Sequence, residues 1–315
     1  MNIHMVYYRI LILLTLNTMV LSCTTIKNAE RPLLDNVIDG IFFESTDGTK
    51  IFYSIFMPNN IPRTTIYIIS GYTGINHEKD RDIIEILGNE TNRVVTIHPR
   101  GTGYSEGIRG GIRNFNLFVN DYVEIINNDI RMNHENKVIL YGHSIGGAFA
   151  LDIGTKIEKI DGMILVNPPY KMKASPGMTP SISEYIKYGF YMVFARHAPI
   201  VNMGGDPSLI SNDQERAEAI ERANDPLVVR YISMYMMVQS RKYLENMLNL
   251  ANDAEYPLIL IYGAEDSVIE KEGCDEIYEN WKFTKKEYQI IENGPHGKQT
   301  VILARNKIKD WINNI

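Results

Sequence analysis

The chain has 315 residues, of which 44% are hydrophobic and 22% are charged, a balance that is ordinary for a globular protein. Its formal charge of −6 argues against a nucleic-acid partner, because neutralising phosphates requires a basic face. The length suits one large α/β domain with an insertion, or two domains.

The N-terminus has the pattern of an export signal. An apolar stretch at residues 10–16 is shorter than the about 20 residues that a membrane span needs. Residues 20–23 read Val-Leu-Ser-Cys and resemble a bacterial lipobox, where a lipoprotein is cleaved and its new N-terminal Cys is acylated. We therefore predict a signal peptide at 1–22, a lipidated Cys23 and a tether covering 23–37, which anchor the protein outside the cytoplasm at a membrane surface. The alternatives are a plain secretory signal, giving a secreted or periplasmic soluble protein, and an uncleaved anchor.

Cysteine usage gives no disulfide framework. If Cys23 is lipidated, Cys274 has no partner within the chain. Cys274 lies in the helical-looking segment 270–280 without a motif for a nucleophile, and we expect a packed thiol.

The folded part begins with a predicted β-hairpin, in which residues 41–44 and 51–56 flank Asp47-Gly48. Short apolar runs then alternate with helix-patterned segments, which indicates an α/β fold with a mostly parallel central sheet flanked by helices. The predicted strands are 65–69, 93–97, 137–141, 162–166, 257–262 and 287–291, and the predicted helices are 79–87, 115–131, 145–157, 270–281 and 299–311.

One interval after residue 166 breaks this alternation. It contains roughly 85 residues without a convincing strand, and a structureless loop of that length is improbable. We therefore expect a helical cap at 171–255, inserted between two core parts at 38–170 and 256–315. The cap is rich in Met and Tyr, which either fill the core or line a surface for an acyl chain. These residues are Met192, Met203, Met234, Met236, Met237, Tyr185, Tyr188, Tyr191, Tyr231 and Tyr235.

The strongest local motif is Gly-His-Ser-Ile-Gly-Gly at residues 142–147, between a predicted strand and a predicted helix. A serine hydroxyl becomes a useful nucleophile when it is exposed, oriented and deprotonated by a base. A sharp strand-to-helix turn achieves the first two, and it demands small residues two positions before and two after the serine. The turn also brings the N–H of Ile145 near a developing oxyanion. Ser144 is therefore the predicted nucleophile.

The base is predicted to be His296, one of seven histidines. It follows the last predicted strand and precedes the last helix, at the carboxyl edge of the sheet. His98 also follows a strand and is the rival candidate. His143 adjoins the nucleophile, so its side chain is expected to point away from Ser144.

The acid must lie between nucleophile and base in chain order. Asp266 follows the strand at 257–262, with Glu265 as second choice, and it would hold the imidazole tautomer and stabilise the imidazolium. The other possible position, residues 167–170, contains no carboxylate, which strengthens Asp266. The alternative role for Asp266 is to cap the helix that follows.

A second oxyanion donor is expected from the turn Ser-Gly-Tyr-Thr-Gly at residues 70–74. Small residues let this backbone approach the substrate, and the N–H of Tyr72 is the predicted donor beside that of Ile145. The alternative is an ordinary glycine turn.

Ser144, Asp266 and His296, with the loop at 98–107 and Asn-Asp-Pro-Leu at 224–227, resemble the monoacylglycerol lipase and lysophospholipase branch of α/β hydrolases, often called serine aminopeptidase S33-like. The resemblance runs from about residue 40 to the C-terminus. It implies the α/β-hydrolase fold and hydrolysis of a small-molecule ester, a monoacylglycerol or lysophospholipid, through an acyl-enzyme. It implies no metal and no cofactor.

Three positions depart from the family pattern. Ser70 stands where the family usually has His, which changes a hydrogen bond supporting the oxyanion loop. His98 stands where Asp is usual. Gly297-Lys298 follows the base, where a bulky apolar residue is common.

Three other functions remain open. A peptidase of the aminopeptidase or proline iminopeptidase kind would need a carboxylate near the cap to hold a substrate amine, and Glu184, Asp206 and Glu215 are candidates. An acyltransferase or thioesterase could use the same triad. A catalytically inactive binding lipoprotein is disfavoured, because such a protein has no need of an intact Ser, His and Asp set. No obligate protein partner is inferred.

Overall fold

A computed structural model describes most of the chain from Gly40 to the C-terminus, namely residues 40–75, 79–173, 181–203, 207–210 and 212–315. The predicted signal peptide, the lipidated Cys23 and the tether lie outside the described residues. Among the described helices, none combines the length and the apolar character required to cross a membrane.

The structure confirms a mostly parallel central sheet of eight strands, in the order β1-β2-β4-β3-β5-β6-β9-β10. β1 (Ile41–Glu44) and β2 (Lys50–Phe56) form the predicted antiparallel hairpin, and β2 also pairs antiparallel with β4. From β4 to β10 all neighbours are parallel, so their carboxyl ends share one edge. The remaining strands are β3 (Thr64–Ile69), β4 (Asn92–Ile97), β5 (Lys137–His143), β6 (Gly162–Val166), β9 (Leu258–Gly263) and β10 (Lys286–Ile291).

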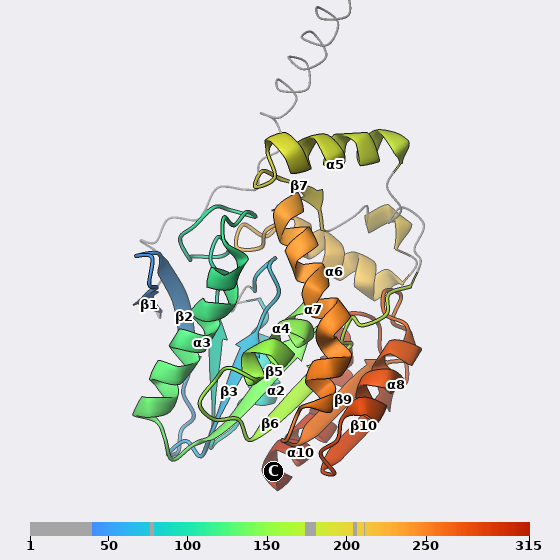
Figure 1. The fold of residues 1–315 in the computed structure, drawn as a ribbon. Helices are drawn as coiled ribbons and strands as arrows, with labels where there is room; N and C mark the ends of the chain where they lie inside the picture. Colours follow the sequence, from blue (N-terminus) through green and yellow to red (C-terminus); the bar gives the residue numbers. More distant parts are fainter. Residues whose placement is uncertain (1–39, 76–78, 174–180, 204–206, 211) are drawn as a thin grey trace, which may run out of the picture.

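Helices cover both faces of the sheet (Figure 1). Leu258 and Leu260 pack in one hydrophobic core and Ile259 and Ile261 in the other, which is why a fully buried strand reads as a continuous apolar run. One face carries α3 (Phe115–Met132), α4 (Ile145–Gly154), α7 (Met234–Asn252) and α8 (Lys271–Asn280), and the other carries α2 (Arg81–Leu87), α9 (Lys298–Leu303) and α10 (Arg305–Asn314).

The single helix predicted at 299–311 is wrong, because the chain forms two helices there that join at Ala304. The sequence does not reveal the break, since Val301, Ala304 and Ile308 all stay on one buried side across it.

Between β6 and β9 the chain builds a cap over the carboxyl edge of the sheet (Figure 1). The prediction that this interval contains no strand is wrong, because two short strands pair antiparallel with Asn202 opposite Tyr231. Each strand has only four or three residues, too few for a recognisable alternation. The cap elements are α5 (Ile182–Phe194), β7 (Pro199–Asn202), the 3₁₀ turn η2 (Pro207–Leu209), α6 (Asp213–Ala223) and β8 (Tyr231–Ser233).

α7 connects the cap to the core. It runs from the cap down beside α4 and α8, and Met247 and Ala251 near its end are fully buried in the core (Figure 1). The last part of the predicted 171–255 insertion therefore packs as a core helix.

The family-like loop at 98–107 is tied to the rest of the core by Arg100. Its Nε donates to Oδ2 of Asp121 on α3 at 2.6 Å, and its Nη1 donates to Oδ2 of Asp47 in the hairpin turn at 2.8 Å. Arg100 and Asp121 are both buried, so each needs the other as a partner.

Candidate active site

Ser144 stands at a strained turn between β5 and α4. Its φ of 50° and ψ of −130° are rarely adopted by a residue other than glycine. A Cβ on Gly146 would lie 2.2 Å from the carbonyl oxygen of Ile69, and one on Gly142 would lie 2.6 Å from Cα of Gly147. Both positions therefore require glycine, which explains the small residues two before and two after the serine.

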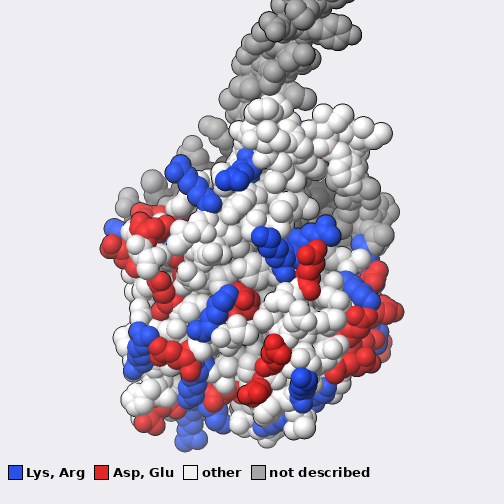
Figure 2. Space-filling model, in the orientation of Figure 1, with Lys and Arg blue, Asp and Glu red and all other residues white. Residues whose placement is uncertain are grey.

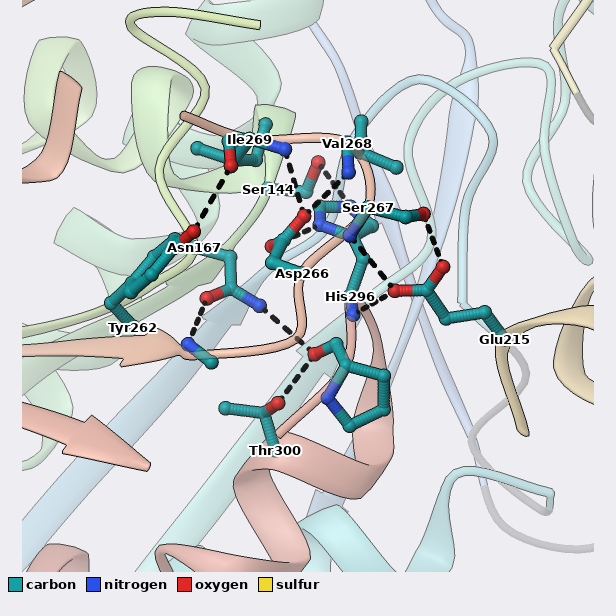
Figure 3. Close-up of polar contacts among 12 residues, drawn as sticks. Ser144, Asn167, Glu215, Tyr262, Asp266, Ser267, Val268, Ile269, His296 and Thr300 are labelled. Atoms are coloured by element: carbon teal, nitrogen blue, oxygen red, sulfur yellow. Dashed lines mark hydrogen bonds and ion pairs between the residues drawn. The ribbon is translucent and has the colours of Figure 1, made fainter. Parts of the chain in front are cut away.

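Ser144, His296 and Asp266 come together at the carboxyl edge of the sheet (Figure 3). Nε2 of His296 lies 3.2 Å from Oγ of Ser144, and Nδ1 of His296 lies 2.7 Å from Oδ2 of Asp266. Asp266 is fully buried, whereas 18% of the His296 side chain is exposed. The hydroxyl, imidazole and carboxylate thus form one hydrogen-bonded chain, the geometry in which a histidine can take a proton from serine.

Asp266 is held as an ionised acceptor. Its Oδ1 accepts the N–H groups of Val268 and Ile269, both at 2.7 Å. Burial raises the pKa of Asp266, but the hydrogen bonds from His296 and these two N–H groups outweigh burial, and the pKa lies below its ordinary value. The alternative role as helix cap does not fit, because Glu270 is the N-cap of α8. Glu265, the second choice for the acid, is exposed and accepts from Asn212.

The two predicted oxyanion loops lie side by side. A Cβ on Gly71 would lie 2.2 Å from Cγ2 of Ile145, and one on Gly146 would lie 3.5 Å from N of Gly71. Tyr72 and Ile145 both line the cavity that contains Ser144.

Ser70 stands where the family usually has a histidine, and Tyr122 of α3 supports the predicted oxyanion loop at this position. Its hydroxyl donates to the carbonyl oxygen of Ser70 at 3.0 Å and lies 3.0 Å from Oγ of Ser70. The departure at Ser70 therefore leaves the loop with a buried hydrogen-bonding partner.

His98 is a structural residue and not a rival base. It is fully buried, its Nδ1 accepts the N–H of Tyr104 at 3.2 Å, and its ring stacks on that of Tyr104.

His143 lies in the site, so the expectation that it would point away is wrong. Its ring lines the same cavity, with its centroid 5.1 Å from that of His296. Burial lowers the pKa of His143 to about 3, and its Nε2 is buried without a hydrogen-bond partner in the described part of the chain. A neutral His143 avoids placing a second imidazolium beside His296.

A cavity of about 760 Å³ lies between the core loops and the cap and opens onto Ser144 and His296. Most of its surface is apolar. Of the Met and Tyr residues expected in the cap, Met203 lines the cavity, whereas Met236 and Tyr191 are buried in the core. The apolar lining also includes Tyr72, Ile145, Ile210, Val229 and Leu244.

Cys274 is fully buried on α8, with Sγ 4.0 Å from the carbonyl oxygen of Pro168. Burial raises the pKa of this thiol, so it stays protonated. The prediction of a packed thiol is confirmed.

Asn167 follows β6, in the segment where the sequence offers no carboxylate. Its side chain joins the loop that holds Asp266 to the loop that holds His296 (Figure 3). Its Oδ1 accepts the N–H of Gly263 at 2.9 Å, and its Nδ2 donates to the carbonyl oxygen of Pro295 at 3.4 Å. Its φ of 46° is one that Asn tolerates better than most residues. The place of Asn167 at the end of a parallel strand was the signal that sequence reasoning did not use.

The three candidate carboxylates for a substrate amine have other surroundings. Glu215 of α6 accepts the N–H of His296 and the hydroxyl of Ser267 (Figure 3). Glu184 forms a capping box with Ser181 at the exposed start of α5. Asp206 lies outside the described residues.

A serine on a strained turn, facing a histidine and a buried aspartate at the edge of a mostly parallel sheet, defines the class of α/β hydrolases. A family model described as serine aminopeptidase, S33, matches residues 60–299. The chain therefore belongs to this family and is a serine hydrolase.

Curated relatives are similar over most of the chain. A human monoglyceride lipase is 23% identical over 255 residues, covering 80% of this chain and 81% of the relative. A monoacylglycerol lipase of Mycolicibacterium smegmatis is 24% identical over 279 residues, covering 86% and 95%.

Solved structures share the fold. A soluble variant of a monoglyceride lipase from Saccharomyces cerevisiae, in complex with a substrate analogue, superposes with a TM-score of 0.72 at 18% identity and covers 91% of this chain and 99% of its own. A monoacylglycerol lipase from Paleococcus ferrophilus gives a TM-score of 0.65 at 21% identity, with 84% and 99% covered. The predicted α/β-hydrolase fold is confirmed.

Proposed function

We propose that this hydrolase cleaves carboxylic esters that carry one acyl chain and a small uncharged headgroup, of the monoacylglycerol kind. The observation that carries the proposal is the hydrogen-bonded chain of Ser144, His296 and Asp266 at the wall of a largely apolar cavity. The names of the curated relatives, monoglyceride and monoacylglycerol lipases, support the same substrate class.

In the proposed reaction, His296 accepts the Ser144 proton while Oγ attacks the ester carbonyl. The N–H groups of Tyr72 and Ile145 hold the oxyanion, and each such donor is worth on the order of a hundredfold in turnover. His296 then gives the proton to the departing alcohol. A water molecule, deprotonated by His296, attacks the acyl-serine and releases the fatty acid and free Ser144.

An uncharged headgroup fits the charges around the cavity. The lining contains five basic and five acidic side chains, so their formal charges cancel. Among the basic ones, Nζ of Lys173 donates to the carbonyl oxygen of Asp266 at 2.5 Å, and Nζ of Lys298 lies 3.8 Å from Oδ2 of Asp82. The lining carries no excess of positive charge that would hold a phosphate, which favours a glycerol ester over a lysophospholipid.

An aminopeptidase reaction, which the family description suggests, is less favoured. The ammonium of such a substrate needs a carboxylate in the cavity with free acceptor capacity. Among the carboxylates that line the cavity, Glu215 and Glu218 already accept backbone N–H groups of the loop around His296. Glu221 and Asp225 lie 3.9 Å and 3.5 Å from Nζ of Lys79.

We further propose that the enzyme works at a lipid surface, held there by the acyl chains on Cys23. The outer side of α5 presents Ile182, Val193 and Phe194, whose exposed fractions are 81%, 74% and 69%. Figure 2 shows few charged side chains over this part of the cap. Exposed apolar surface of this kind supports contact with a membrane.

The test compares substrates on the protein lacking residues 1–23. A series of monoacylglycerols of increasing chain length is measured against a lysophosphatidylcholine and an aminoacyl amide, with Ser144→Ala as the blank. We expect kcat/KM for the best monoacylglycerol to exceed that for the lysophospholipid by about tenfold or more, because the lining has no net positive charge to hold the phosphate. Preference for the lysophospholipid or the amide would overturn the proposal.

A further inference from the structure

Two carboxylates on the cap helix α6 reach into the loop that carries His296. The first is Glu215, which is 7% exposed. Glu215 accepts the backbone N–H of His296, the backbone N–H of Ser267 at 3.3 Å, and the hydroxyl of Ser267 (Figure 3). One buried side chain from the cap therefore joins the loop after β9, which holds Asp266, to the loop after β10, which holds His296.

The second carboxylate is Glu218, one turn further along α6. Its Oε2 accepts the N–H of Lys298 at 3.2 Å. Gly297 has a φ of 137°, and a Cβ added there would lie 2.2 Å from Oε2 of Glu218. The glycine after the base, a departure from the family pattern, is thus what lets Glu218 approach this backbone.

The start of α6 fixes the direction of Glu215. Oδ1 of Asn212, the N-cap residue, accepts the N–H groups of Gln214 at 2.9 Å and Glu215 at 3.1 Å. Nδ2 of Asn212 donates to Glu265 at 3.4 Å, so the first turn of α6 is itself tied to the loop that holds Asp266.

The backbone of residues 295–298 is consequently held from two sides. Asn167 of the core binds the carbonyl oxygen of Pro295, and the two glutamates of the cap bind the N–H groups of His296 and Lys298. Hydrogen bonds to an ionised acceptor are about twice as strong as neutral ones. Catalytic geometry is sensitive to such support, because a displacement of about 1 Å can cost a hundredfold in rate.

We propose that Glu215 and Glu218 are positioning residues of the active site, which clamp the His296 loop to the cap and align the imidazole with Ser144. The proposal rests on the serine-hydrolase mechanism above and goes beyond it, since it assigns the cap a part in aligning the base. α6 also lines the cavity through Ala219 and Arg222, so a shift of this helix changes the substrate wall and the His296 loop together.

The first experiment removes the Glu215 carboxylate from the full-length protein in detergent. We expect Glu215→Ala to lower kcat on a p-nitrophenyl ester on the order of a hundredfold, with KM changed by less than about threefold, because the alignment of His296 is lost. Glu215→Gln keeps an oxygen acceptor for the His296 N–H but loses the charge, so kcat should be about a tenth of the wild-type value, between those of Glu215→Ala and the wild type. The matched control is Asp213→Asn, which removes an exposed carboxylate from the first turn of the same helix and should leave kcat unchanged.

The second experiment uses the contact between Gly297 and Glu218. Gly297→Ala should lower kcat, since its Cβ would displace the Glu218 carboxylate and its φ favours glycine. If Glu218 acts through this contact, the double variant Gly297→Ala with Glu218→Ala should lose less than the product of the two single losses.

The outcomes separate this inference from the proposed function. A wild-type protein that reacts with neither ester nor fluorophosphonate removes the proposed function. An active wild type with folded Glu215→Ala and Glu215→Gln variants within about twofold of its kcat overturns the clamp alone, since a positioning residue should cost more. If Glu215→Ala does not fold, Glu215→Gln decides: unchanged kcat contradicts the clamp, and reduced kcat at unchanged KM supports it.

Discussion

The two walls of the active-site cavity are built by different means. On the core side, Ser144, Asp266 and His296 stand on short loops at the ends of parallel strands, and residues such as Leu260 and Ile261 beneath them are fully buried. On the cap side, Ala219 and Arg222 of α6 form part of the wall. Elsewhere in the cap, α5 exposes much of its apolar surface. The cap joins the catalytic loops through polar side chains of α6. The comparison indicates that the core fixes the reacting groups, whereas the cap shapes the substrate space and aligns the base.

The largest effect is expected on the core side, from Asp266→Asn. Asparagine would still accept the N–H groups of Val268 and Ile269, but its amide would present the wrong partner to His296. We expect kcat to fall by about 10⁴-fold, because the imidazole is held in the wrong tautomer. Measured ester hydrolysis with a fall of less than about tenfold would show that the buried carboxylate is not part of the reaction.

Next in size is Asp121→Ala, which tests the rigidity of the core frame. It would remove the buried carboxylate partner of Arg100 and leave its guanidinium with contacts to Asp47 in the hairpin turn and to Oγ of Ser45. We expect the free energy of unfolding to fall by about 3 kcal/mol in chemical denaturation. Asn120→Ala, an exposed neighbour on α3, is the control and should change it by less than about 0.5 kcal/mol. Equal effects of the two substitutions would contradict a buried ion pair.

A smaller effect depends on pH and concerns His143, where the core wall meets the cavity. Burial lowers its pKa from 6.5 to about 3, so between these values the unfolded chain binds a proton that the folded protein does not. Stability should therefore decrease as pH falls through this window, by at most about 1.4 kcal/mol per pH unit from this residue. Unfolding measured between pH 6.5 and 4.5 avoids the range where Asp266 titrates. His143→Gln should flatten the slope, and an unchanged slope would show that this imidazole is not held neutral.

The smallest change in stability is expected on the cap. Phe194→Glu on α5 should alter the free energy of unfolding by less than about 0.5 kcal/mol, since the side chain is already 69% exposed. Turnover of a soluble ester should also be unchanged, whereas hydrolysis of monoacylglycerol presented in vesicles should fall. The control is Met132→Glu, which makes the same kind of change at an equally exposed residue at the end of α3, outside the cap. Equal vesicle activity of both variants would argue against a membrane-facing α5.

The sequence predicts the core well for physical reasons. Strands such as β3 and β9 are buried on both faces, so their sequences are short apolar runs. The residues that follow these parallel strands meet at one edge of the sheet. That rule was enough to place Ser144, Asp266 and His296 near each other. The glycines on either side of Ser144 could be recognised as part of the turn, because a side chain at either position would clash with backbone atoms.

The polar contacts around the triad could not be predicted in the same way. Glu215 and His296 are separated by 81 positions in the chain, and Tyr122 and Ser70 by 52. Hydrogen bonds between residues so far apart in the chain produce no periodic pattern in the sequence. The sequence singles out Glu215 as a carboxylate near the cap, but its partner depends on how α6 is placed over the sheet.

A serine hydroxyl activated by His296 is the central feature of the proposed mechanism. The direct measurement is the reaction of the full-length protein in detergent with a fluorophosphonate, followed by mass spectrometry of its peptides. We predict one adduct on Ser144, no adduct in Ser144→Ala, and slow labelling in His296→Gln. An active protein with Ser144 unmodified, or with the adduct on another residue, would contradict the account.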